Sequence, residues 1–335
     1  MDFKAEIAKR GSRAVKYLVD QVSQLVNPEV PLRQAVLHYP VNGGGKGFRP
    51  AMLQLVTGAL GGDEANSIPA AAAIEAVHVS SLIHDDWMDN DETRRGVPAV
   101  WAQWDPTIAI LSGDVLFGVA FAMAGEIDGI GYDMKYQFAR DLAKVYIELC
   151  HGQMLDIDFE KRDYDSISVD EIKEMQYLKT GVLFEFACVT GARLALGKME
   201  DELVDKIREY AKLAGTAFQI QDDIIGLVGD PGDVGKPIGS DILEGKRTII
   251  AVHAINNANE EQSKTLHAIL GNENATEDDI ASCLQIMKDI GSIKFAKSLA
   301  MEMANEAIKI TDILPENENT QILKQFAGYM VERDI

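Results

Sequence analysis

The chain has 335 residues, 47% of them hydrophobic, so it can bury a large core and is neither disordered nor fibrous. Its 32 basic and 53 acidic residues give a formal net charge of −21, which disfavours binding to nucleic acids and anionic membranes. The three cysteines, Cys150, Cys188 and Cys283, are far apart and lack metal-ligand spacing, so we expect neither a disulfide framework nor a zinc site.

Apolar residues recur at helical spacing through most of the chain, as at Ala14, Leu18 and Val22, whereas alternating strand-like runs are scarce. Loop signals rich in glycine separate segments that suit long helices. Ser168 with Glu171 fits a capping box, and Thr276 opens another helix. We therefore predict an all-α protein that forms one domain over residues 1–335.

Neither the N-terminal residues nor the most apolar stretch suggests membrane insertion. Residues 1–10 mix charges where a signal peptide has an apolar run, and the most apolar stretch, residues 115–124, is too short to span a bilayer. We expect a soluble, cytoplasmic protein without a membrane span.

The first segment with chemical character is a glycine-rich turn with the sequence GGGKGFRP at residues 43–50. Glycines let backbone amides approach an anion closely, and Lys46 and Arg49 add positive charge, so the turn is a candidate diphosphate cradle. It lacks Walker spacing, and an ordinary basic turn is the alternative.

An Ala-rich apolar helix, expected to begin at Pro69, leads to Asp85, Asp86 and Asp89. On a continuing helix Asp85 and Asp89 share a face one turn apart, whereas Asp86 is rotated by about 100°. Two carboxylates a turn apart can grip a hard cation together with diphosphate oxygens. The alternative is a solvated acidic helix end.

Basic residues lie on both sides of this aspartate cluster. Arg94 and Arg95 follow it, and unlike charges this close suggest a site for a highly charged ligand such as diphosphate with its metals. His78 precedes Asp85 by about two helical turns and lies on nearly the same face. A lone histidine on an apolar helix is usually a core residue, but this one is directed toward the predicted metal site.

A second apolar helix carries Asp222 and Asp223, with Gln219 on nearly the same face as Asp222. Two such clusters suggest metal sites that face each other across a cavity, whereas a polar helix surface is the alternative. Lysines recur near the acidic motifs, although each taken singly is most often a surface residue. They are Lys179, beside Thr180, and Lys236 and Lys246.

Taken in order, these landmarks resemble the trans-isoprenyl diphosphate synthase family over nearly the whole chain. They are GKxxRP at 45–50, DDxxD with two arginines at 85–95, Gly113-Asp114, Gly152-Gln153, Lys179-Thr180 and the motif at Asp222. The resemblance implies the isoprenoid synthase type I fold, a bundle of long helices around a central cavity. It also implies a homodimeric, Mg²⁺-dependent trans-prenyltransferase that joins isopentenyl diphosphate to an allylic diphosphate (dimethylallyl, geranyl or farnesyl).

The resemblance further implies a role for each matching residue. Isopentenyl diphosphate would be held by Lys46, Arg49 and His78, with Arg95 helping. Mg²⁺ would be ligated by Asp85, Asp89 and Asp222, supported by Asp86 and Asp223. The allylic diphosphate and the developing cation would be surrounded by Arg94, Lys179, Thr180, Gln219, Lys236 and Lys246. The expected catalytic set is Asp85, Asp86, Asp89, Lys179, Thr180, Gln219 and Asp222.

One departure affects the second aspartate motif. It ends in Gly226, where many family members have a third aspartate. We therefore expect the metal site there to depend on Asp222 and Asp223, with Asp241 acting through water.

The residues before Asp85 bear on the length of the product. None is aromatic; they are Ser80, Ser81, Ala76, Val77, Ala73 and Ala72. In the family a bulky residue four or five positions before the first aspartate stops growth early. We therefore expect geranylgeranyl diphosphate, with a longer polyprenyl diphosphate as the alternative, and we expect Ser80→Phe to shorten the product.

Two other functions use parts of the same pattern. A class I terpene cyclase would also need Mg²⁺ and aspartates, but it would leave the basic turn at Lys46 and Arg49 without a second diphosphate to hold. A non-catalytic, synthase-like subunit is favoured only by Gly226. We therefore rank the prenyltransferase first.

Overall fold

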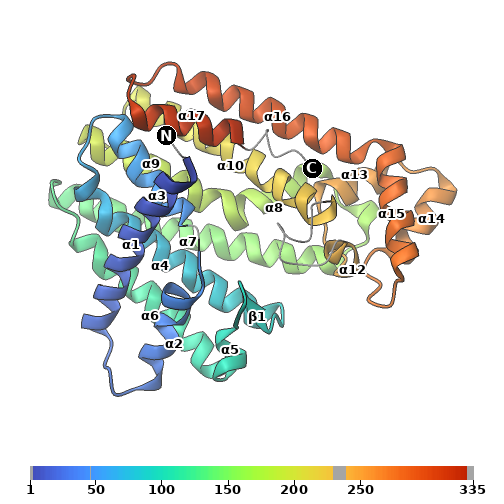
Figure 1. Cartoon of the computed structure of the whole chain (residues 1–335), viewed down its shortest axis with the longest axis horizontal. Helices are drawn as coiled ribbons and strands as arrows, with labels where there is room; N and C mark the ends of the chain where they lie inside the picture. Colours follow the sequence, from blue (N-terminus) through green and yellow to red (C-terminus); the bar gives the residue numbers. More distant parts are fainter. Residues whose placement is uncertain (1–2, 46, 229–238, 330–335) are drawn as a thin grey trace. The chain divides into compact units, whose positions relative to one another are not determined.

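The computed structural model describes residues 3–45, 47–228 and 239–329. This part of the chain is almost wholly helical (Figure 1), and its strands are the two-residue β1 (Thr93–Arg94) and β2 (Val97–Pro98), which pair antiparallel. The prediction of an all-α protein is confirmed.

The chain forms two compact units, each gathered from separate segments. The first comprises residues 1–146, 183–208 and 313–323, and the second comprises residues 147–182, 209–312 and 324–335. Asp85 therefore belongs to the first unit and Asp222 to the second.

The first unit is built around α4 (Glu64–Met88), which packs against α6 (Pro106–Gly125), α3 (Phe48–Ala59) and α1 (Phe3–Leu25). A run of fully buried alanines, residues 70–73, lets neighbouring helices approach α4 closely. The other helices that contribute to this unit are α2 (Pro31–Asn42), α5 (Val100–Gln103), α7 (Tyr132–Lys161), α9 (Val182–Leu196), α10 (Glu202–Val228) and α17 (Glu318–Tyr329).

Helix α4 begins earlier than its sequence suggests. The expected start was Pro69, but the helix starts at Glu64 because the Asp63 side chain caps it, accepting a hydrogen bond from the Ala65 amide at 2.9 Å. Pro69 therefore lies inside the helix.

The second unit contains the remainder of α7, α10 and α17 and a series of other helices. Its capping boxes at Ser168 and Thr276 confirm both predicted helix starts. Lys179 and Thr180 lie in the π-helical turn η2 (Tyr177–Gly181). The elements of the second unit include η1 (Tyr164–Ser166), α8 (Val169–Gln176), η2 (Tyr177–Gly181), α12 (Ser240–Leu243), α13 (Ile249–Asn257), α14 (Glu260–Ile269), α15 (Glu277–Ile290) and α16 (Ser292–Thr311).

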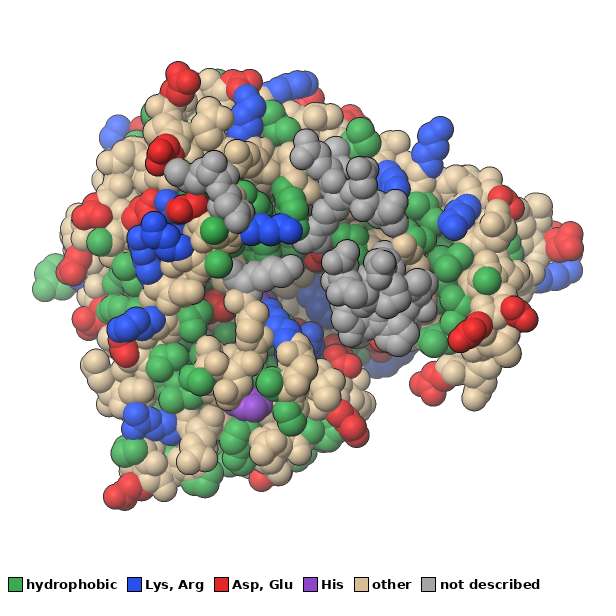
Figure 2. All heavy atoms as spheres, viewed as in Figure 1, with side chains coloured by type: hydrophobic (Ala, Val, Ile, Leu, Met, Phe, Trp, Pro, Cys, Tyr) green, Lys and Arg blue, Asp and Glu red, His purple; other side chains and the backbone are tan. Residues whose placement is uncertain are grey.

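In the described residues, α6 is the one helix whose length and apolar composition would allow it to cross a membrane. It is longer than the apolar stretch recognised in the sequence, and close to half of its apolar window is buried. The core helices of soluble proteins, which are mostly buried, can be as long and as apolar. On the face that Figure 2 shows, acidic and basic side chains are interspersed rather than gathered by sign.

Candidate functional site

Asp86 is fully buried and has partners on both carboxylate oxygens. Arg94 donates to its Oδ1 from Nε at 2.7 Å and also from Nη2, and the Tyr39 hydroxyl donates to its Oδ2. Burial, followed by the hydrogen bond to this carboxylate, raises the pKa of Tyr39 above its usual value. Asp86 therefore positions Arg94, a role that fits its predicted rotation away from the Asp85 face.

Removing the Tyr39 hydroxyl should show how much its hydrogen bond to Asp86 contributes to the stability of the protein. We expect Tyr39→Phe to lower the free energy of unfolding by about 1–2 kcal/mol, because one buried carboxylate oxygen loses its donor. Chemical denaturation measures the change. Tyr136→Phe, at a tyrosine that is 69% exposed, is the control and should leave stability unaltered. Equal stabilities for Tyr39→Phe and the wild type would contradict this account.

Asp85 and Asp89 lie one turn apart at the C-terminal end of α4, and the Asp89 amide donates to the Asp85 carbonyl at 2.7 Å. Asp85 is half-buried and Asp89 is exposed, so a ligand can reach both. The negative end of the helix dipole adds to their attraction for a cation. Mg²⁺ sites often combine one or two carboxylates with substrate phosphates, and this donor set fits such a site.

The described residues contain no cluster of three or more His, Cys, Asp and Glu side chains suited to a metal ion. A cation held by Asp85 and Asp89 would therefore take further ligands from a bound diphosphate or from water.

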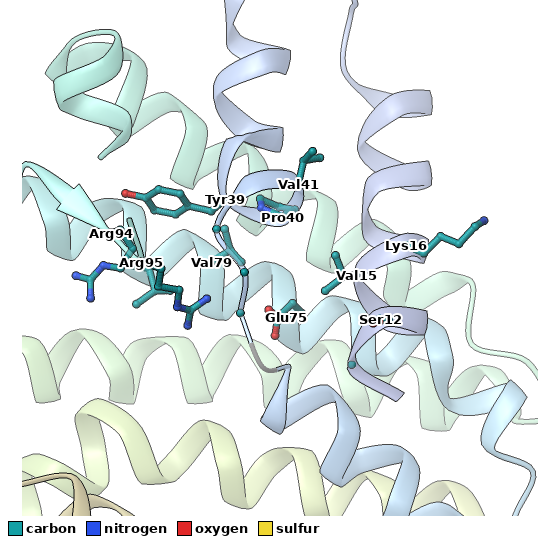
Figure 3. Close-up of a pocket in the computed structure, with 15 residues that line it drawn as sticks. Ser12, Val15, Lys16, Tyr39, Pro40, Val41, Glu75, Val79, Arg94 and Arg95 are labelled. Carbon is teal, nitrogen blue, oxygen red and sulfur yellow. The ribbon is translucent and has the colours of Figure 1, made fainter. Parts of the chain in front are cut away.

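A pocket of about 310 Å³ opens in the first unit beside α4 (Figure 3). The glycine turn forms one wall, and its glycines have a specific purpose: a Cβ on Gly45 would lie 2.4 Å from Nη1 of Arg95, so a side chain there would displace the guanidinium. The pocket thus places a bare backbone turn against two cations. Its lining includes residues 43–45, Arg94, Arg95, Glu75 and, from α1, Ser12 and Lys16.

Arg49 of α3 and His78 of α4 lie together in the first unit. Arg49 Nη1 is 3.3 Å from His78 Nε2, and because arginine can only donate, Nε2 accepts and the proton of a neutral imidazole lies on Nδ1. Burial first, and then the charges of Arg49, Arg95 and Arg94, hold the pKa of His78 well below its usual value. A neutral His78 can therefore offer Nδ1–H to an anion without adding charge.

In the second unit, Lys179 lies in the π-helical turn η2 and donates from Nζ to Asp156 of α7. The backbones of α7 and η2 approach each other closely here, because a Cβ on Gly152 would lie 2.2 Å from the Lys179 amide nitrogen. Gly152 of the Gly152-Gln153 landmark is therefore needed for packing against η2.

Asp223 lies in a cluster that spans α8, α10 and the segment after α12. Gln176 donates to its Oδ2 at 2.7 Å, and Lys246 pairs with Asp241 at 3.4 Å. Burial, with the charges of Asp241 and Asp222, raises the pKa of Asp223 to about 7, although Gln176 and Lys246 act in the opposite direction.

The geometry at Gly226 accounts for the missing third aspartate. A Cβ at this position would lie 2.6 Å from Oδ2 of Asp241, whose carboxylate fills the space beside the helix. Asp241 is 9% exposed. A side chain at 226 and the present position of Asp241 are therefore incompatible.

The structure brings together some of the predicted site residues but not all of them. Arg94 is bonded to Asp86 and Arg49 to His78, and the charges of Asp241 and Lys246 act on the pKa of Asp223. Thr180 and Gln219 are half-buried, and Asp222 is exposed on α10. Lys46 and Lys236 lie outside the described residues.

Four residues with roles here were not among the predicted site residues: Tyr39, Glu75, Asp156 and Gln176. A weak signal existed for Asp156, which follows the Gly152-Gln153 landmark by one helical turn. Tyr39 is far from Asp86 in sequence, so the sequence contained no signal for its role.

Residues 30–287 match the family model described as polyprenyl synthetase, which is more than half of the chain. The chain belongs to the polyprenyl synthetase family. This confirms the resemblance drawn from the ordered motifs, and this polyprenyl synthetase is a prenyltransferase.

Relatives of this polyprenyl synthetase are similar over nearly their whole length. A geranylfarnesyl diphosphate synthase from Aeropyrum pernix is 36% identical over 323 residues, covering 95% of this chain and 98% of the relative. The structure of a geranylgeranyl pyrophosphate synthetase from Pyrococcus horikoshii has a TM-score of 0.90 at 35% identity, over 99% of this chain and 98% of that one.

A third similar protein was solved with ligands bound. A geranylgeranyl pyrophosphate synthase from Corynebacterium glutamicum, solved with isoprenyl diphosphate and magnesium, has a TM-score of 0.86 at 26% identity, with both chains fully covered. The similarity to these proteins shows that the chain has the isoprenoid synthase fold.

Proposed function

We propose that this polyprenyl synthetase is a Mg²⁺-dependent trans-isoprenyl diphosphate synthase that joins isopentenyl diphosphate to an allylic primer and releases geranylgeranyl diphosphate. The observation that carries the proposal is the pairing of Asp85 with Asp89 at the end of an apolar helix, beside a pocket walled by Arg94, Arg95 and glycines. A longer polyprenyl diphosphate is the alternative product.

The carboxylates of Asp85, Asp89 and Asp222 hold the Mg²⁺ in this proposal. Mg²⁺ held by these carboxylates would supply positive charge against the negative charge that builds on a diphosphate leaving group. Asp223 supports metal binding at Asp222. The close approach of Gly226 and Asp241 supports the participation of the Asp241 carboxylate in the same site.

Cations of the first unit hold the diphosphates. Lys46, Arg49, His78 and Arg95 bind isopentenyl diphosphate, and Arg94, oriented by Asp86, binds the allylic diphosphate. Arginine suits this role because its planar fork bonds two phosphate oxygens at once.

The second unit supplies cations and oxygen dipoles. Lys179, Lys236 and Lys246 bind the allylic diphosphate, and the oxygens of Thr180 and Gln219 face the carbon that develops positive charge. The apolar residues around Gln219, such as Ile220 and Ile224, exclude water that would quench this carbon.

One incubation tests the function. Purified protein is given labelled isopentenyl diphosphate and farnesyl diphosphate, with Mg²⁺ or with EDTA. We expect a product one unit longer than the primer, loss of all extension with EDTA, and recovery when excess Mg²⁺ is added. A cyclised product would indicate a terpene cyclase, and no product even with Mg²⁺ present would indicate a non-catalytic subunit.

We further propose that residues 1–335 act as one domain in a cytoplasmic homodimer that spans no membrane and binds no nucleic acid. Ile110 and Leu111 on α6 support self-association, since these apolar side chains are 45% and 44% exposed. Sedimentation equilibrium should give twice the mass of the chain, and the mass of a single chain would refute the dimer.

A further inference from the structure

The turn that carries Lys246 is held by contacts to which the proposed function gives no task. The carbonyl oxygen of Gly245 accepts two hydrogen bonds, from Nη1 of Arg247 at 2.5 Å and from the hydroxyl of Tyr164 at 2.8 Å. The backbone is confined as well, since Gly245 has a left-handed φ of 67° and a Cβ on it would lie 2.8 Å from the Cα of Gly271. The position of Lys246 is therefore set by its neighbours along the chain and not by its own side chain alone.

Arg247 ties this turn to the C-terminal end of α7. Its Nη2 donates to the carbonyl oxygens of Glu160 and Arg162, each at 3.0 Å. The last carbonyls of a helix have no partner within the helix, and a cation near them also interacts favourably with the helix dipole. The guanidinium thus bridges three backbone carbonyls, which its planar fork of donors allows and the single ammonium group of a lysine does not.

Tyr164 of η1 restrains both the guanidinium and the turn. The Cζ of Arg247 lies 4.2 Å from the centroid of the Tyr164 ring, a distance at which a cation is attracted to the ring face. Tyr164 is 5% exposed. One buried tyrosine therefore orients the arginine with its ring and the Gly245 carbonyl with its hydroxyl, so these two restraints can be removed separately.

The C-terminal part of α7 also supports another lysine of the second unit. Lys179 donates to Asp156 of α7 through its side chain. Lys246 directly precedes Arg247, and its Nζ lies 3.4 Å from Oδ1 of Asp241. Helix α7 is thus a common support for two lysines to which we assign the allylic diphosphate, through a side chain for Lys179 and through backbone carbonyls for Lys246.

We propose that Arg247 and Tyr164 are positioning residues that hold the Gly245 turn so that Lys246 is presented to the diphosphate of the allylic primer. This inference rests on the proposed function, because it takes Lys246 as a ligand of that diphosphate. It assigns both residues to the affinity for the primer and not to that for isopentenyl diphosphate. Arg247 acts through the geometry of the turn, because its Nη1 and Nη2 donate to backbone carbonyls.

Steady-state kinetics, with each substrate varied in turn, tests the proposal. We expect Arg247→Lys to raise the KM for farnesyl diphosphate about tenfold, because an ammonium keeps the charge but cannot bridge three carbonyls. The KM for isopentenyl diphosphate should not change. Tyr164→Phe, which keeps the ring and loses only the hydroxyl, should raise the KM for farnesyl diphosphate about threefold.

A double variant shows whether Arg247 acts through Lys246. Lys246→Ala alone should raise the KM for farnesyl diphosphate, and adding Arg247→Lys should raise it no further, because the group that is positioned is already absent. Additive increases would mean that Arg247 affects the primer by another route. Either that result or an unchanged KM in Lys246→Ala would overturn the proposal.

Arg193→Lys is the matched control. Arg193 of α9 also donates to a backbone carbonyl, that of Met199 at 2.9 Å, and to Asp141 at 2.9 Å, and we assign none of these residues to a substrate. The control should leave both KM values unchanged, even if it lowers Tm. If Arg247→Lys has the wild-type KM for farnesyl diphosphate, or raises the KM values of both substrates alike, the role of Arg247 is refuted. If the wild type extends no primer, the proposed function itself is wrong.

Discussion

Asp85→Asn should lower kcat for chain extension by about 10³-fold. Asparagine keeps the size and one oxygen of the side chain but removes the charge with which Asp85 and Asp89 attract a divalent cation. The helix should be unaffected, because the residue is half-buried and close to the end of α4. Radiolabel incorporation measures the loss, and circular dichroism verifies the fold.

The control for this variant is Glu92→Gln, which removes a charge from an exposed side chain seven residues along. Glu92→Gln should retain nearly full activity, since the Glu92 side chain does not belong to the pair formed by Asp85 and Asp89. Asp85→Asn should also need a higher Mg²⁺ concentration for half-maximal activity. Similar losses of activity in both variants would mean that the overall negative charge of this region, and not a metal site at Asp85, is needed for activity.

The features that the sequence predicted well are those that depend on local spacing. The one-turn relation between Asp85 and Asp89 follows from helical geometry, and so does the rotation of Asp86, whose buried contact with Arg94 agrees with it. The capping box at Ser168 could likewise be predicted, because all its groups lie within four residues.

Features that depend on distant parts of the chain could not be predicted in this way. Tyr39 reaches Asp86 across 47 residues, and the space at Gly226 is filled by Asp241 from beyond the next segment. Periodicity says which face a residue occupies but not which partner lies opposite. For the same reason, the facing arrangement of Asp85 and Asp222 stays a prediction.

The product-length hypothesis changes most when the structure is considered. The sequence named Ser80 as the residue to enlarge, but Ser80 is fully buried and donates to the Gly113 carbonyl of α6 at 2.9 Å. A phenylalanine there would push against α6 and cost about 1–3 kcal/mol of stability. A shorter product from Ser80→Phe would therefore be hard to separate from disturbed packing.

Ser81 is the better probe, because it is half-buried and lies one turn before Asp85 on the same face as His78. Within the described residues its hydroxyl donates only to the His78 carbonyl, one turn earlier, so the bond that is lost is local. We expect Ser81→Phe to shorten the main product by at least one isoprene unit, since the ring would block the path of a chain that grows along this face. Mass spectrometry of the dephosphorylated products measures it. Ser81→Ala, which loses the same bond but adds no bulk, should make the wild-type product; if Ser81→Phe does so too, the growing chain does not follow this face of α4.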